Sequence, residues 1–191
     1  VLREPMESGE IMISRIAAQI CFPANFQLIA AMNPCPCGFL GSSRCRCTPD
    51  QINRYRSKIS GPLLDRIDLQ VQVTKIDNKQ LLNKSEKPQG ESDRDIQQRI
   101  SDARERQIER QGKINSQLSS QELITIRRHN TEQQALMDSA INRFALSTRG
   151  FYRVLRVARS IADLENRHEV KTADYQEALS YRITSDTKET S

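Results

Sequence analysis

The sequence predicts an α/β unit followed by an all-α unit, and three observations support this division. An almost continuous apolar run at residues 26–32 is typical of a strand that is covered on both faces. Residues 77–92 are rich in Lys, Asn, Ser, Gly and Glu, as linkers are. The apolar residues that follow have helical spacing. We therefore expect an α/β portion over 1–76, a linker over 77–92, a helical bundle over 93–184 and a disordered tail over 185–191.

The α/β portion is predicted to contain a hairpin and two further strands. Apolar and polar residues alternate over residues 11–13 and again over 20–22, and a basic tip made of small residues separates them. This pattern predicts a β-hairpin with Arg15 near its tip, leading into the central strand at 26–32. Alternation over residues 69–73 predicts a strand with one wet face at a sheet edge. Arg15 could equally be an ordinary solvated surface charge.

Two polar residues stand next to these predicted strands. Pro34 cannot donate to a β-ladder and holds Asn33 extended, so Asn33 would present its amide at the carboxyl end of a buried strand. Open α/β sheets bind their ligands at such ends, which makes Asn33 a candidate site residue. The alternative is a turn-forming role before the proline. Arg66 precedes the edge strand and is a second candidate, the alternative being a local ion pair with Asp65 or Asp68.

Four cysteines follow Asn33 closely. Cys35, Cys37, Cys45 and Cys47 form a C-x-C-x7-C-x-C array, and the glycines between the two pairs allow the loop to reverse direction. Four thiolates on so short a loop can converge on one tetrahedral ion, for which zinc is the best candidate. Because C-x-x-C is the commoner spacing, disulfides or free thiols remain alternatives.

Composition indicates a soluble protein of a reducing compartment. The 191 residues are 37% hydrophobic and 28% charged, without an apolar run of membrane-spanning length or a signal-peptide pattern at the N-terminus. We therefore expect a cytoplasmic protein, in which cysteines favour metal over disulfides. The net charge of +5 permits binding to polyanions. Because the chain begins at Val1 rather than Met, we expect it to be a fragment.

The region after residue 92 predicts five helices joined by short connections. The first runs from about Asp93 to Gln111 and ends at Gly112. A short helix follows the capping-box residues Ser119 and Glu122. The other three are expected from about residue 131 to 144, after the N-cap Ser147, and from residue 172.

Several longer strings in this order resemble the C-terminal portion of the bacterial magnesium-chelatase-like AAA+ ATPases, in particular the YifB/ComM family. The resemblance covers nearly the whole chain. The matching strings are LREPMESGEI (2–11), FQLIAAMNPCPCG (26–38), CRCTPDQ (45–51), SGPLLDRIDL (60–69) and LSTRGFYRVLRVARSIADL (146–164).

The resemblance implies a role for each candidate residue. Asn33 would be the sensor-1 residue that orients the attacking water, at the end of the sensor-1 strand. Arg66 would be an arginine finger offered to the nucleotide of the adjacent subunit. Arg149 would be sensor 2 on a helical lid, with Arg153 and Arg156 as competing candidates. Arg15 would lie on the pre-sensor-1 hairpin, which in helicase relatives contacts DNA phosphates.

The resemblance also implies ATP and Mg²⁺ as cofactors, a homo-oligomeric ring, expected to be a hexamer, and branched or single-stranded DNA as partner. The chain departs from the family pattern in one respect: it contains no G-x-x-x-x-G-K-[ST] motif and no acidic Walker B strand. We therefore expect that this chain alone does not hydrolyse ATP.

A zinc-stabilised helical module without a motor role would leave Asn33 and Arg66 without a purpose. Two functions from different classes are compatible with these features. The first is a DNA motor like the ComM branch-migration helicase of natural transformation. The second is a chelatase-type ATPase that remodels a protein or a metal-tetrapyrrole complex. The cysteine array favours the first, because the motor subunits of magnesium chelatases lack it.

Overall fold

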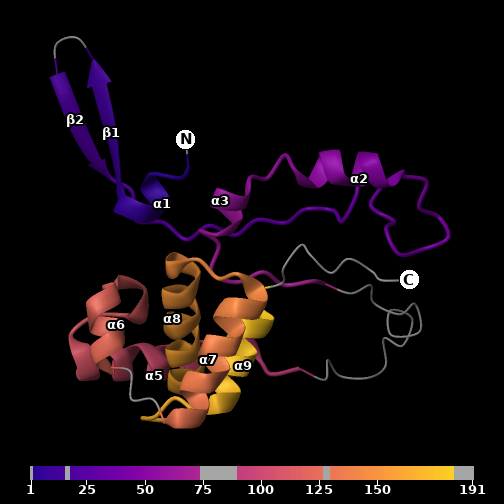
Figure 1. The fold of residues 1–191 in the computed structure, drawn as a ribbon. Coiled ribbons are helices and arrows are strands. Elements are labelled where there is room, and N and C mark those ends of the chain that lie inside the picture. The colour runs from indigo at the N-terminus through magenta and orange to yellow at the C-terminus, as the bar shows by residue number, and fades with distance from the viewer. Residues whose placement is uncertain (1, 16–17, 74–89, 127–129, 183–191) are drawn as a thin grey trace. The chain divides into compact units, whose positions relative to one another are not determined.

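A computed structural model describes residues 2–15, 18–73, 90–126 and 130–182 (Figure 1). The chain divides into two compact units, Val1–Ile67 and Asp68–Ser191, which are described separately below. The tail expected at 185–191 and most of the linker expected at 77–92 lie outside the described residues. Within these ranges, no helix is both long enough and apolar enough to cross a membrane.

The first unit contains one hairpin and three short helices. Helix α1, Pro5–Ser8, ends at Gly9, whose φ of 70° lets the chain turn into the hairpin. The antiparallel strands β1, Glu10–Arg15, and β2, Ala18–Pro23, confirm the predicted hairpin, with Ile11 opposite Phe22 and Ile13 opposite Ile20. The residues between the strands, 16–17, lie outside the described ranges. Helices α2, Pro49–Arg56, and α3, Gly61–Leu64, complete the unit.

The predictions of a central strand at 26–32 and an edge strand at 69–73 are wrong for this structure. Neither stretch belongs to a β-sheet, and the described residues hold a single two-stranded sheet, β1 with β2. Ile29 and Val73, which a covered sheet would bury, are 85% and 87% exposed. A strand requires a partner for its backbone groups, and none of the described residues forms a β-ladder with these stretches. Within the predicted edge strand, the Gln70 N–H donates to the Tyr181 carbonyl at 2.8 Å, outside any β-sheet.

The second unit is helical, and its helices begin and end close to the predicted positions. Helix α5 spans Asp93–Gln111 and ends at Gly112, whose φ is 73°. It is followed by the 3-10 helix η1, Asn115–Gln117, and by α6, Ser120–Ile126, α7, Thr131–Phe144, α8, Thr148–Leu164, and α9, Thr172–Ser180. Side-chain caps explain several of these starts, because Ser147 accepts from the Gly150 N–H and Ser119 from the Glu122 N–H.

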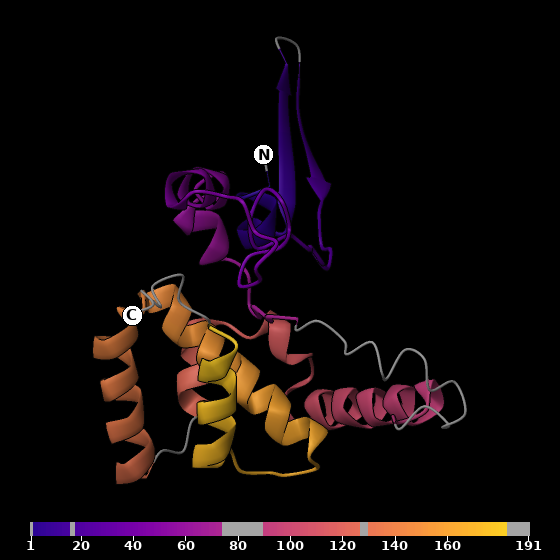
Figure 2. The ribbon, with the colours of Figure 1, turned by 90° about the vertical axis from the view of Figure 1, so that its right-hand side faces the viewer.

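Helix α8 is the centre of this unit. It contacts α5, η1, α6 and α9, and it runs beside α9 in both views of the ribbon (Figures 1 and 2). The apolar core lies between α7, α8 and α9, where Met137 and Ala158 are fully buried. Its other buried members are Ala140, Val154, Leu155, Tyr175, Ala178 and Leu179. This packing of amphipathic faces gives the helices most of their stability.

A buried carboxylate joins α5 to the end of α8. The side chain of Asp163 is 1% exposed and accepts hydrogen bonds from Arg110 at 2.6 Å, from Arg159 at 2.9 Å and from Asn115 at 2.8 Å. Burial by itself would raise the pKa of Asp163, but hydrogen bonds from Arg110 and Asn115 and the charges of Arg159 and Arg110 lower it below the ordinary 3.8. The carboxylate is therefore ionised and fully paired near neutral pH.

We expect Asp163→Ala to lower the free energy of unfolding of this unit by about 3–5 kcal/mol, because it leaves two guanidinium groups unpaired in a largely dry site. Chemical denaturation followed by circular dichroism measures this loss. Since folding lowers the pKa of Asp163, its contribution is present above about pH 4 and is lost as pH falls further. The exposed Asp138 serves as control, and Asp138→Ala should change stability by less than about 0.5 kcal/mol. Equal losses in both variants would contradict the role of Asp163.

Candidate functional site

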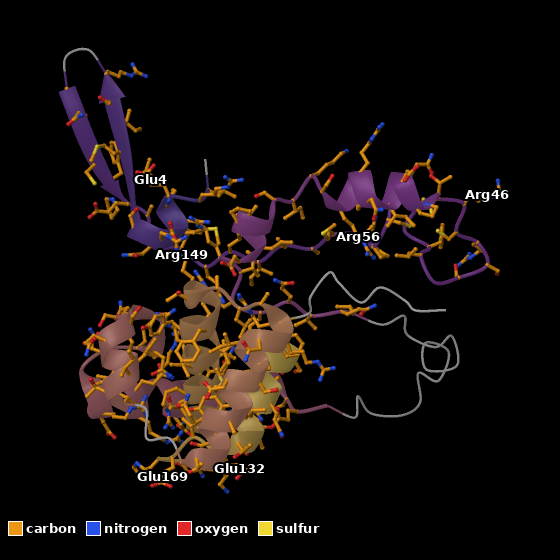
Figure 3. All side chains as sticks on the ribbon, in the orientation of Figure 1. Glu4, Arg46, Arg56, Glu132, Arg149 and Glu169 are labelled. Atoms are coloured by element: carbon orange, nitrogen blue, oxygen red, sulfur yellow. The ribbon has the colours of Figure 1, made fainter. Side chains whose placement is uncertain are left out.

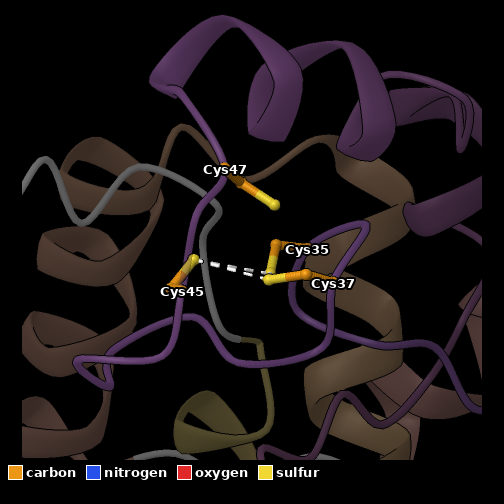
Figure 4. Close-up of side chains that lie close together, drawn as sticks. All are labelled: Cys35, Cys37, Cys45 and Cys47. Atoms are coloured by element: carbon orange, nitrogen blue, oxygen red, sulfur yellow. Dashed lines mark hydrogen bonds between the residues drawn. The ribbon is translucent and has the colours of Figure 1, made fainter.

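The four sequence-predicted cysteines converge on one point in the first unit (Figure 4). Their sulfur atoms all lie within 4.8 Å of one another, with Cys35–Cys37 at 3.4 Å, Cys37–Cys45 at 3.7 Å and Cys35–Cys45 at 3.9 Å. A zinc–sulfur bond of about 2.3 Å gives a tetrahedron whose sulfur–sulfur edge is about 3.8 Å. The four side chains therefore fit a tetrahedral metal ion, and none of them forms a disulfide.

Local turns of the backbone bring the cysteines together. The Gly38 N–H donates to the Cys35 carbonyl at 3.0 Å, and the Cys45 N–H donates to the Ser42 carbonyl at 3.0 Å. Gly38 and Gly41 adopt φ values of 79° and 82°, which residues with a Cβ rarely adopt. The glycines between the two cysteine pairs are thus required by the geometry of the loop.

The electrostatics of the cluster favour a bound cation. Backbone N–H groups of Phe39 and Arg46 lower the pKa of Cys37 to about 6, so this thiol readily becomes a thiolate. A backbone hydrogen bond from Cys37 would lower the pKa of Cys47, but hydrogen bonding to the Cys37 side chain and burial raise it to about 12. Several negative sulfurs this close repel one another unless a cation neutralises them, as a bound metal ion does.

Helix α2 is attached to both ends of this cysteine loop, which we define as residues 35–47. The loop ends at Cys47, directly before Thr48, whose hydroxyl caps α2 by accepting from the Gln51 N–H. The Arg56 Nε at the other end of α2 donates to the Pro34 carbonyl at 3.3 Å, just before Cys35. The cysteine loop and α2 therefore form one connected piece of structure, and Arg56 is a residue that sequence reasoning missed.

Asn33 lies beside the start of the cysteine loop. Its side chain is next to Gly38, where an added Cβ would stand 3.7 Å from the Asn33 Cγ. Asn33 itself is exposed and lies at the end of the unpaired stretch at 26–32.

Arg66 is largely enclosed within the first unit. Its side chain is 11% exposed, donates to the Pro62 carbonyl at 2.6 Å, and forms an ion pair with Glu7 at 2.7 Å. Its Nε is buried and has no hydrogen-bond partner among the described residues. Asp68, expected as a possible local partner, is in the second unit and pairs with Arg153. Glu7 was missed by sequence reasoning, because no sequence pattern links residues 59 positions apart.

The three arginines considered for sensor 2 differ in their surroundings within the helical unit. Arg153 pairs with Asp68, and Arg156 donates to the Leu118 carbonyl at 2.8 Å. Arg149 is exposed in the first turn of α8 and is labelled in Figure 3. Arg149 is exposed, whereas Arg153 and Arg156 are half-buried.

Arg15 is exposed at the end of β1, where it pairs with Ala18 across the hairpin. The same face of the hairpin carries apolar side chains, since paired residues of an antiparallel ladder project to one side. Ile11, Ile13, Ile20 and Phe22 are between 41% and 51% exposed on this face. This face of the hairpin thus carries exposed apolar side chains and, at the end of β1, the cation of Arg15.

Two family models match the chain in succession. The model described as magnesium chelatase, subunit ChlI, matches residues 1–81, and the model described as magnesium chelatase, subunit ChlI C-terminal, matches residues 90–182. These matches place the chain in the class of magnesium-chelatase-like proteins.

Individual relatives make the assignment more specific. Competence protein ComM of Haemophilus influenzae and the uncharacterized protein YifB of Escherichia coli are each 42% identical over 181 residues, or 95% of this chain. The uncharacterized protein Rv2897c of Mycobacterium tuberculosis is 37% identical over 187 residues, 96% of the chain and 36% of that relative. The chain belongs to the magnesium-chelatase-like YifB/ComM family. It spans 35% of the length of ComM and of YifB.

Proposed function

We propose that this chain supplies the nucleotide-sensing and trans-acting part of a ring-forming AAA+ ATPase that acts on DNA, as a branch-migration helicase does in natural transformation. The observation that carries the proposal is the family assignment, with 42% identity to a relative named a competence protein. AAA+ proteins are generally oligomeric, which suits a homo-oligomeric ring, a hexamer in this proposal. The motor activity belongs to the full-length protein, of which this chain is one part.

The surroundings of Arg66 support a role as arginine finger. The guanidinium is held by Glu7 and Pro62, which fixes its direction. A planar guanidinium stays charged and can contact two phosphate oxygens, so it suits the charge that develops on the transferred phosphoryl group. In this proposal the phosphate belongs to the nucleotide of a neighbouring subunit.

Asn33 and Arg149 take the two sensing roles in the proposal. Asn33 can hydrogen-bond the attacking water through its amide, and it stands two positions before the first residue of the cysteine loop. Arg149 is favoured over Arg153 and Arg156 as sensor 2, because it is exposed in the first turn of α8 whereas those two are half-buried. ATP and Mg²⁺ are the cofactors of the full-length ring. This chain holds no Walker motif for them, so its residues act on a nucleotide that other residues bind.

The cysteine cluster has a structural role in this proposal. We assign one zinc ion to Cys35, Cys37, Cys45 and Cys47, with all four positions filled by thiolates. A closed site of this kind binds no substrate and instead holds the fold of its loop. Its function here is to brace the segment that follows Asn33.

The description of the matching family models favours a second candidate, a chelatase-type ATPase that remodels a protein or a metal-tetrapyrrole complex. DNA binding distinguishes the two. In the favoured proposal, the full-length protein binds forked DNA more tightly than linear duplex, and its affinity falls steeply with salt because phosphate contacts release counterions.

Fluorescence anisotropy with labelled forked and linear DNA, at several salt concentrations, measures this preference. We expect Arg15→Ala to weaken binding about tenfold if the hairpin contacts phosphates, while Arg94→Ala, an exposed arginine of α5, leaves it unchanged. Absence of binding to any DNA at low salt, with ATP present, would refute the DNA-motor proposal and leave the chelatase-type alternative.

A further inference from the structure

One short stretch of the first unit has a net positive charge almost as large as that of the whole chain. Residues 39–58 carry five cationic side chains and one carboxylate, a net charge of +4 compared with +5 for all 191 residues. The cationic residues are Arg44, Arg46, Arg54, Arg56 and Lys58, and all five are exposed. No ion pair among the described residues involves any of them, so their charge is not offset within the described structure. Four thiolates around a zinc ion would add about −2, which leaves the stretch positive.

These cations belong to one connected surface. Arg44 and Arg46 lie on the cysteine loop, while Arg54, Arg56 and Lys58 lie on α2 or directly after it. The loop runs into the start of α2, and Arg56 ties the end of α2 back to Pro34. Figure 3 shows Arg46 beyond one end of α2 and Arg56 on the helix itself. We call this surface, residues 39–58, the basic loop-helix surface.

Aromatic side chains are interleaved with the cations. The Arg44 guanidinium stands 4.5 Å from the centre of the Phe39 ring, and Phe39 is 43% exposed although no apolar core requires it there. The Lys58 ammonium stands 6.0 Å from the centre of the Tyr55 ring. Tyr55 is half-buried, so Phe39 is the more accessible of the two rings. Aromatic rings beside cations are the features with which proteins hold single-stranded nucleic acid, because bases stack on the rings while the cations contact phosphates.

We propose that the basic loop-helix surface is a binding site for single-stranded DNA, separate from the hairpin that carries Arg15. Arg46 and Arg54 contact phosphates, and Phe39 with Arg44 forms a platform on which a base stacks. Single-stranded DNA is favoured over duplex because the faces of its bases are accessible to Phe39. It is favoured over an acidic protein because such a partner would use the cations but would not require the exposed ring. The choice of DNA rests on the proposed function.

The test measures binding of the full-length, zinc-loaded protein to a fluorescein-labelled 30-nucleotide oligo-dT by anisotropy at several salt concentrations. Arg46→Gln with Arg54→Gln should weaken binding at least tenfold and reduce the slope of log K against log salt by about 1.4, since each single-strand phosphate contact contributes about 0.7. The matched control is Arg94→Gln with Arg104→Gln, two exposed arginines of α5, which should leave both quantities unchanged. Arg46→Lys with Arg54→Lys keeps the charge and should restore most of the binding.

Phe39→Leu tests the stacking platform independently of charge. We expect it to weaken oligo-dT binding about tenfold without changing the salt slope, and to leave binding to a duplex hairpin of the same charge unaffected. Zinc content and circular dichroism equal to those of the wild type establish that each variant is folded. If the wild type binds oligo-dT and both sets of variants bind equally well, this inference is wrong while the proposed function stands. If the wild type binds no DNA, both are wrong.

Discussion

Replacing Arg66 by alanine in the full-length protein is expected to lower ATP turnover by about a thousandfold, the usual effect of removing an arginine finger. ATP binding should stay near normal, because Arg66 acts on the nucleotide of the neighbouring subunit in our proposal. Steady-state hydrolysis and equilibrium nucleotide binding, measured on the same preparation, separate the two effects. Arg66→Lys should recover little activity, since an ammonium group lacks the planar fork of donors.

Arg3→Ala is the matched control for this experiment. Arg3 is exposed in the same unit and donates to the Ser60 hydroxyl at 2.7 Å, so its loss removes an arginine and one hydrogen bond without touching Arg66. Mixing the Arg66→Ala protein with a variant defective in ATP binding should restore part of the activity, because each subunit supplies what its neighbour lacks. Hydrolysis by Arg66→Ala at the wild-type rate would show that Arg66 does not act in trans.

Protein purified without chelator should contain close to one zinc ion per chain, held by the four clustered cysteines. Cys35→Ser should abolish the bound zinc and unfold the cysteine loop, because Cys35 is fully buried and the apparent free energy of zinc binding at such sites is on the order of 10 kcal/mol. Elemental analysis gives the zinc content, and thermal denaturation with and without chelator gives its contribution to stability.

Cys21→Ser provides the control for the zinc experiment. Cys21 lies on β2, is exposed, and has its sulfur 3.2 Å from a Glu10 carboxylate oxygen, outside the cluster. The variant should therefore retain its zinc and its melting temperature. Recovery of a folded wild-type protein without metal would remove the structural role assigned to the cluster.

The parts of the fold that depend on local signals could be predicted from the sequence. The hairpin follows from alternation over 11–13 and 20–22, and α5 follows from the helical spacing of its apolar residues and from Gly112. The cysteines could be placed together because the first and the third are only ten positions apart. In each of these cases, the residues that determine the structure lie close together in the chain.

The errors arose where a structure needs distant or external partners. Residues 26–32 have the composition of a buried strand, but composition does not say which strands pair with it or whether they belong to this stretch of chain. The ion pair of Arg66 with Glu7 joins residues 59 positions apart, and that of Asp68 with Arg153 joins residues 85 positions apart. Pairs at such separations depend on the tertiary fold and leave no periodic signal.

Asp68 and Gln70, which follow Arg66 closely in the chain, are both held by the helical unit. Ile67 ends the first unit, and directly after it Asp68 is paired with Arg153 of α8 while the Gln70 backbone is bonded to Tyr181. Only one residue, Ile67, therefore separates the proposed finger from Asp68. Since the backbone spans at most about 3.6 Å per residue, the Cα atoms of Arg66 and Asp68 stay within about 7 Å of each other.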